Sequence, residues 1–295
     1  MFKTKSCVSL LVCLVAACAL SQSAKADTLV WGFDASYSNP QLVEVNANTG
    51  AIVTNFTAPN PTAAAGNGRA IAVVGTTIYY GIAGSGDVFV TNSITHADGG
   101  VLFNTGLGGI ATIAWDGSHL WVSAYDGSNN AYEYSLSGTK LATVPGFGNL
   151  RDGFEVANNT IIANRGDGVG PYDVYNLSGT LITSDFLNTS GISGITTGVT
   201  FDGTDYWVSN PDGYSGGATQ NLLEYNLSGT LIHTTLLGPP GPQASVGWLL
   251  EDLSSLGNVP SNPPPSTTPE PASLWLLGSG LLGLLVAYRR KLQSA

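Results

Sequence analysis

The chain has 295 residues, of which 43% are hydrophobic and 10% charged, and a formal net charge of −10. Between residues 27 and 268, four cations oppose nineteen of the twenty carboxylates. This acidic surface argues against nucleic acid and anionic membranes as partners, because both require a basic patch. The abundance of Gly, Thr, Ser and Asn predicts strands and turns, and region 27–253 has a suitable length for one all-β domain.

Residues 1–26 have the pattern of a secretory signal peptide. Lys3 and Lys5 precede an apolar run, and Ala24 and Ala26 place small residues at a cleavage point before Asp27. The pattern predicts export through the Sec translocon and cleavage by signal peptidase. A lipobox ending at Cys18 is the alternative. In either case the mature domain has no disulfide, because the three cysteines lie in or beside the removed segment: Cys7, Cys13 and Cys18.

A repeat occupies region 27–253. Residues 110–143 and 198–234 share Asp-Gly, Trp-Val-Ser, Glu-Tyr and Leu-Ser-Gly-Thr in the same order. Residues 152–183 give a third copy, and residues 28–54 and 71–104 give two weaker ones. Each copy is predicted to form four short strands and three turns, because Asp-Gly and Ser-Gly pairs favour hairpins. The glycines assigned to the third turns are spaced as in propeller blades: Gly50, Gly99, Gly138, Gly179 and Gly229.

The ends of the repeat region predict how a ring closes. The first copy lacks an innermost strand, and residues 246–250 have the pattern of a lone strand, so the two together would complete one blade. We therefore predict an all-β fold, a five-bladed β-propeller, with six blades or a stacked β-solenoid as alternatives. Through the Trp-Val-Ser and Leu-Ser-Gly-Thr phrases, the blades resemble NHL and YVTN-type propeller repeats.

One face of such a propeller is a candidate ligand face. Connections between blades and loops between second and third strands emerge there, so Arg69 and Arg151, each just before a first strand, are expected on it. A planar guanidinium suits carboxylate-bearing sugars. The same rule predicts a loose ring of carboxylates, which is a candidate Ca²⁺ site, although Asp before Gly is also what these turns require. The ring consists of Asp34, Asp87, Asp126, Asp167 and Asp212.

The residue inventory does not point to an enzyme. His96, His119 and His233 are isolated in the sequence and are interpreted as surface histidines. A glycoside hydrolase or lyase is an alternative because it needs only two carboxylates, of which Glu155 is the one identifiable buried candidate. The tryptophans at the same position of two repeats, Trp121 and Trp207, favour core packing over sugar stacking. No cofactor other than Ca²⁺ is expected.

The C-terminal region has two parts. Residues 254–268 are rich in Ser, Asn and Pro, which predicts a stiff linker. Region 269–295 contains an apolar run, 272–288, that is long enough for a single transmembrane helix. The basic tail after it would stay in the cytoplasm. The residues that mark this region are Pro269, Glu270, Pro271, Arg289, Arg290 and Lys291.

This triplet, helix and basic tail resemble the PEP-CTERM sorting signal of exported bacterial proteins. The resemblance implies recognition by an exosortase, which is a membrane processing enzyme, and removal of the tail. An ordinary C-terminal anchor is the alternative. The protein is thus expected to be membrane-anchored first and to reach the cell surface or extracellular matrix after processing.

These expectations combine into one hypothesis of function. The protein is an exported, non-catalytic binding or structural propeller associated with exopolysaccharide or biofilm. The alternatives are a polysaccharide-active enzyme and a self-associating adhesion or surface-layer component.

Overall fold

The computed structural model describes residues 27–35, 40–60, 68–148, 150, 152–166, 170–211, 220–238 and 248–256. The chain divides into two compact units, Met1–Val259 and Pro260–Ala295, and the second lies outside the described residues. Among the described residues, no helix is both long enough and apolar enough to cross a membrane. The predicted signal peptide and transmembrane helix both lie outside them.

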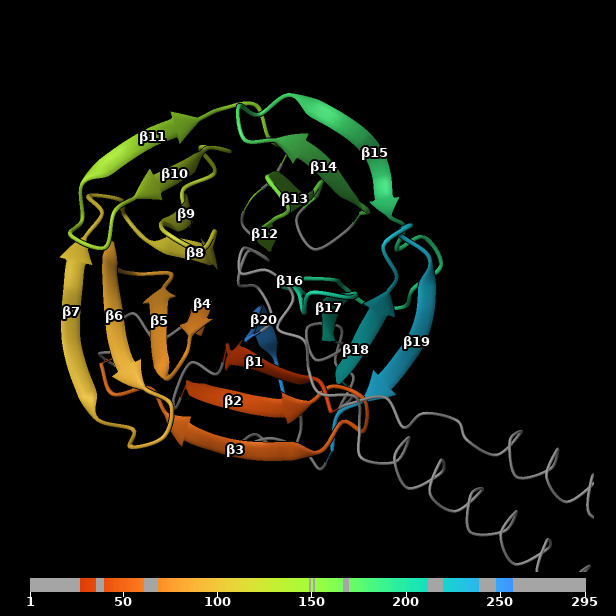
Figure 1. Ribbon diagram of the computed structural model, residues 1–295, viewed down its shortest axis with the longest axis horizontal. Helices are drawn as coiled ribbons and strands as arrows, with labels where there is room; N and C mark the ends of the chain where they lie inside the picture. The colour runs from red at the N-terminus through yellow and green to blue at the C-terminus, as the bar shows by residue number, and fades with distance from the viewer. Residues whose placement is uncertain are drawn as a thin grey trace, which may run out of the picture. The chain divides into compact units, whose positions relative to one another are not determined.

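The described strands form five four-stranded antiparallel sheets around a common axis, which are the blades of the predicted five-bladed propeller (Figure 1). From the axis outward, blade 1 contains β20 (Leu250–Ser255), β1 (Leu29–Asp34), β2 (Gln41–Asn46) and β3 (Ile52–Thr57). Blade 2 contains β4 (Gly68–Val74), β5 (Thr77–Ile82), β6 (Asp87–Asn92) and β7 (Asp98–Asn104). Blade 3 contains β8 (Ile110–Trp115), β9 (Leu120–Ala124), β10 (Ala131–Tyr134) and β11 (Lys140–Val144).

The remaining two blades follow the same order. Blade 4 contains β12 (Phe154–Ala157), β13 (Thr160–Asn164), β14 (Tyr172–Asn176) and β15 (Leu181–Leu187). Blade 5 contains β16 (Val199–Phe201), β17 (Tyr206–Pro211), β18 (Gln220–Tyr225) and β19 (Leu231–Leu236).

Blade 1 is built from both ends of the repeat region, as predicted. β20 pairs antiparallel with β1, and Val30 lies opposite Ser255. The prediction of this strand at 246–250 was wrong, because β20 begins at Leu250 and continues to Ser255. Ser254 and Ser255, assigned to the linker from the sequence, are buried in the blade.

The third turns of blades 3, 4 and 5 follow the repeated Ser-Gly-Thr. Gly138, Gly179 and Gly229 have φ near +80°, in the left-handed region where a residue without a Cβ is favoured. In blade 2 the assignment of Gly99 to this turn was wrong. Gly99 lies within β7, and the turn precedes it, with the Asn92 side chain accepting hydrogen bonds from backbone N–H groups and His96 at φ 55°.

The hydrophobic core is divided among the interfaces between neighbouring blades. Five clusters of buried side chains lie there, one for each pair of adjacent blades. Trp121 belongs to the cluster between blades 3 and 4, and Trp207 to the cluster between blades 5 and 1. The structure therefore confirms that these tryptophans pack in the core. Each blade is held mainly by its neighbours, so closing the ring is a condition for burying the last interface.

Candidate functional site

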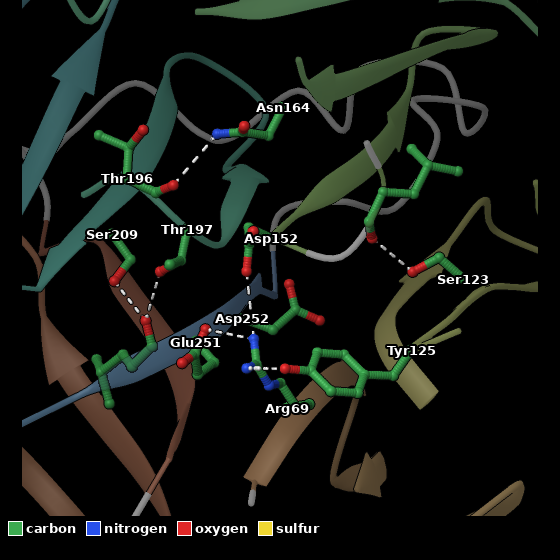
Figure 2. A network of polar contacts seen from close by, with 12 residues as sticks. Arg69, Ser123, Tyr125, Asp152, Asn164, Thr196, Thr197, Ser209, Glu251 and Asp252 are labelled. Carbon is green, nitrogen blue, oxygen red and sulfur yellow. Dashed lines mark hydrogen bonds and ion pairs between the residues drawn. The ribbon is translucent and has the colours of Figure 1, made fainter. Parts of the chain in front are cut away.

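The candidate site lies at the axis, where Arg69 is the second residue of β4 and points toward residues of three other blades (Figure 2). Its Nη1 donates hydrogen bonds to Glu251 Oε2 at 3.0 Å and to Asp152 Oδ1 at 3.2 Å, and its Nη2 donates to the Tyr125 hydroxyl at 2.9 Å. The guanidinium carbon also lies 4.4 Å from the centre of the Tyr125 ring. We call these four residues the axial cluster.

Burial increases from Tyr125 inward through the axial cluster. The Tyr125 residue is 37% exposed, whereas the side chains of Asp152, Arg69 and Glu251 are 12%, 9% and 2% exposed. Ion pairs at this depth are screened little by salt, and removing one partner leaves a buried charge without compensation. The axial cluster is therefore a buried polar centre with one exposed aromatic ring on it.

Glu251 is the most unusual group of the axial cluster. Burial raises its pKa to about 7, Arg69 opposes this shift, and the carboxylates of Asp152 and Asp34 add to it. Its Oε1 is buried and has no hydrogen-bond partner among the described residues. Since a buried oxygen without a donor is costly, this atom marks a place where a proton or a hydrogen-bond donor would be bound.

The next residue, Asp252, connects blades instead of binding Arg69. Its Oδ2 accepts hydrogen bonds from the backbone N–H groups of Ile71 at 3.0 Å and Ile113 at 3.1 Å, which belong to the innermost strands of blades 2 and 3. Burial raises its pKa well above the usual range, although these backbone donors lower it. The Ser254 hydroxyl accepts a third such bond, from Val73 N–H at 2.8 Å.

Further axial bonds join β20 to blade 5. The carbonyl oxygen of Leu250 accepts hydrogen bonds from the hydroxyls of Thr197 at 3.0 Å and Ser209 at 2.5 Å (Figure 2). The Ser255 hydroxyl donates to the carbonyl of Phe201. β20 is therefore held by hydrogen bonds to blades 2, 3 and 5 in addition to its own sheet.

The structure places the predicted ligand-face residues in different surroundings. Arg69 lies at the axis, whereas Arg151 lies outside the described residues. Of the predicted carboxylate ring, Asp34 is buried and accepts a hydrogen bond from Leu249 N–H, Asp87 binds Ser85 and Asn104, and Asp126 accepts from Ser128 N–H in an exposed turn. Asp167 and Asp212 lie outside the described residues, so the Ca²⁺ site stays a prediction.

Sequence reasoning identified Arg69 but missed its partners. Tyr125 precedes the repeated Asp-Gly pair but corresponds to Pro211 in blade 5, so the repeat gives it no role. Asp152 is the first residue of its copy, and Glu251 lies in the strand whose position was predicted wrongly. Glu155 is buried as predicted, and its Oε2 accepts a hydrogen bond from the Thr200 hydroxyl at 3.0 Å. The sequence did not identify a second buried carboxylate to accompany Glu155. The structure shows two in β20, Glu251 and Asp252.

Comparisons with known proteins agree with the C-terminal motif. Residues 267–291 match the model of the PEP-CTERM protein-sorting motif. No curated protein matches the chain. A crystal structure of a protein of unknown function from Bacteroides caccae is similar, with 12% identity, a TM-score of 0.49, and coverage of 78% of this chain and 98% of that chain. A chain of a nidogen/laminin complex has 12% identity, a TM-score of 0.48, and coverage of 78% and 99%.

Fold and motif together define the class of protein. The chain is a five-bladed β-propeller that carries a PEP-CTERM sorting motif near its C-terminus. This motif implies an exported, membrane-anchored protein that is processed by an exosortase. The resemblance of the blades to NHL and YVTN-type repeats stays a prediction.

Proposed function

We propose that this protein is a non-catalytic binding or structural propeller of the extracellular polysaccharide matrix or biofilm. The observation that carries the proposal is the sorting motif at 267–291 on the same chain as a rigid five-bladed ring. Signal peptidase and the Sec translocon would act first, and an exosortase would then release the propeller to the surface or matrix. An acidic, disulfide-free surface is compatible with that location.

The axial cluster supplies a candidate ligand face. Tyr125 offers a partly exposed aromatic ring, and flat apolar rings match the faces of pyranose sugars. Arg69 lies under this ring and orders it through a hydrogen bond and a cation–π contact. Because the ring is held in place, little conformational entropy would be lost on binding.

Retention on the host's own polysaccharide tests the proposal. The protein recovered from its host should be retained by matrix polysaccharide from the same organism, and Tyr125→Ala should weaken binding about tenfold, the value of one aromatic contact. Leu136→Ala is the matched control, because Leu136 is 40% exposed and lies at the third turn of the same blade. Absence of retention contradicts polysaccharide binding, and self-association without polysaccharide would favour an adhesion or surface-layer component.

Intact-mass spectrometry of cell and medium fractions tests the location. A mass that begins at Asp27 and ends near Pro269 to Pro271 would establish signal-peptide removal and exosortase processing. A mass in the membrane fraction that retains Arg289 and the residues after it would mean that the tail is only an anchor. The matrix role would then lose its main support.

A glycoside hydrolase is the second candidate function, and one observation favours it. Glu251 and Asp152 both bind Arg69 Nη1, so their oxygens cannot lie farther apart than the sum of two hydrogen-bond lengths. A carboxyl group with a pKa near 7 is suited to act as a general acid. Reducing-end release from matrix polysaccharide, lost in Glu251→Gln, would support this activity. No release by the wild type contradicts it.

A further inference from the structure

Three metal-ligating side chains converge on blade 3, away from the axial cluster. Asp116 and His119 lie in the turn between β8 and β9, and Glu133 lies on β10. This turn is at the opposite end of β9 from Tyr125. One ligand atom from each residue lies within 4.8 Å of the other two. We call these residues the blade 3 triad.

The spacing of the ligand atoms fits a small divalent cation. His119 Nδ1 is 2.9 Å from Glu133 Oε1 and 3.6 Å from Asp116 Oδ2. Zinc bonds of about 2.0 to 2.1 Å in tetrahedral geometry separate neighbouring ligand atoms by about 3.3 Å. These two separations lie on either side of this value, so the imidazole needs to shift by only a few tenths of an ångström relative to each carboxylate, and the ligand atoms of the two carboxylates lie within 4.8 Å of each other.

The imidazole and the carboxylates of the blade 3 triad also have partners within the protein. His119 Nδ1 can share a proton with Glu133 Oε1 at 2.9 Å and lies 3.3 Å from the Ser118 hydroxyl. Asp116 Oδ2, 3.6 Å from this nitrogen, is beyond hydrogen-bond distance of the imidazole and accepts a hydrogen bond from Trp121 instead. A divalent cation in the same place would interact with both carboxylates and with the deprotonated nitrogen.

Hydrogen bonds fix the orientation of the Asp116 carboxylate. Its Oδ2 accepts a hydrogen bond from Trp121 Nε1 at 2.8 Å, and its Oδ1 accepts from the backbone N–H groups of Ser118 at 2.8 Å and His119 at 2.7 Å. Trp121 also lies directly opposite Glu133 in the strand register. Supporting hydrogen bonds of this kind fix the orientation of metal-binding carboxylates.

Blade 5 contains the same scaffold without the imidazole. Trp207 Nε1 donates to Asp202 Oδ2 at 2.9 Å, and Trp207 lies opposite Glu224. The position equivalent to His119 is occupied by Asp205, and these residues form no three-ligand group among the described residues. The histidine therefore changes the donor set of this repeated feature from three oxygens to one nitrogen and two oxygens. A site with this donor set favours zinc, whereas calcium is bound by oxygen ligands.

We propose that the blade 3 triad binds Zn²⁺ or a cation of similar preference, with His119 Nδ1, Asp116 Oδ2 and Glu133 Oε1 as protein ligands. His119 is 36% exposed, so water would complete the coordination. This site is separate from the proposed polysaccharide face and does not depend on it.

Titration with Zn²⁺ tests the proposal, using the full-length chain in detergent without a polyhistidine tag. Wild-type protein should bind one Zn²⁺, and its melting temperature should rise by about 5 °C at a hundredfold excess over Kd. His119→Ala and Glu133→Gln should each abolish this rise. Ca²⁺ at the same concentrations should have no comparable effect.

His233→Ala is the matched control, because His233 also lies beside a glutamate, Glu224, in the strand register. It should retain the Zn²⁺-dependent rise. Co²⁺ added to wild type should give visible absorption bands that His119→Ala lacks, a result that does not depend on melting behaviour. The proposal is overturned if wild type shows no Zn²⁺ effect, or if His119→Ala responds as wild type does.

Discussion

Glu251 is a buried carboxyl group that shares one guanidinium with Asp152. Two effects act on it in opposite directions: burial disfavours its ionised form, and Arg69 stabilises that form. Burial is the larger effect, so the pKa rises to about 7. The axial cluster therefore holds a proton over part of the neutral range, where ordinary glutamates are ionised.

This raised pKa predicts a pH-dependent stability. The folded value of about 7 exceeds the ordinary value of 4.5, so the folded state binds the proton more tightly. The resulting stabilisation is complete below pH 4.5 and is lost as the pH rises through 7. Between pH 4.5 and 8 the free energy of unfolding of wild type should fall by about 3 kcal/mol more than that of Glu251→Gln.

Urea denaturation of both proteins across this pH range measures the difference. Asp252 also titrates abnormally, but it is present in both proteins and its contribution cancels. Parallel pH profiles for the two proteins would mean that Glu251 has the same pKa in the folded and the unfolded state.

At the residue scale, the sequence predicts the cation of the axial cluster but not its anions. Arg69 was expected just before a first strand and is the second residue of that strand, β4, which blade topology places at the axis. Asp152 and Glu251 reach the same point from other blades, and only the closed ring brings them together. His119 appeared isolated because its partner Glu133 lies on the next strand, and the register between those strands cannot be read from the turn alone.

β20 shows how an element can be polar in sequence and buried in structure. All six of its residues are buried, including Glu251, Asp252, Ser254 and Ser255. Their side chains bind groups of neighbouring blades, so burial is compensated by hydrogen bonds. The hydrophobic residues of 246–250, which include Trp248 and Leu250, therefore predicted the strand at that segment instead.

The close contact of β20 with blade 5 predicts a sensitive glycine. A Cβ at Gly198 would lie 2.5 Å from the Asp252 Cα and 2.6 Å from the Leu253 nitrogen, both of them backbone atoms. Gly198→Ala should therefore force the blade away from β20 and lower the free energy of unfolding by at least about 2 kcal/mol.

Gly108→Ala is the control for this substitution, because no atom lies within 4 Å of a Cβ there. Its free energy of unfolding should stay within about 0.5 kcal/mol of wild type. Thermal melts of the two variants measure the contrast, and equal melting temperatures would show that β20 can shift freely.

At the scale of the whole molecule, the blade count is predictable because the repeat is local. The Ser-Gly-Thr turn recurs at the same place in blades 3, 4 and 5, and each blade needs its neighbours to cover its faces. The closure by both ends follows from the incomplete first repeat. The repeat cannot predict the contacts at the axis, because the hydrogen bonds that β20 makes there occur once in the chain and do not recur from blade to blade.

Two truncations test this role of β20 in the ring. A chain that stops after Leu256 keeps β20 and should show a cooperative thermal transition. A chain that stops after Leu249 leaves β1 without its inner neighbour and leaves the N–H groups of Ile71 and Ile113 without acceptors. It should show no such transition by circular dichroism, and a normal melt would mean that four complete blades are sufficient.

The pairing of Val30 with Ser255 has a topological consequence. β1 and β20 are neighbours that run in opposite directions. The start of β1, where the chain enters the ring, and the end of β20, where the chain leaves it, therefore lie at the same end of blade 1. A short peptide could join them, and the chain could be opened at an exposed turn such as Ser178–Gly179 instead. The resulting circular permutant would have the same contacts in a different order.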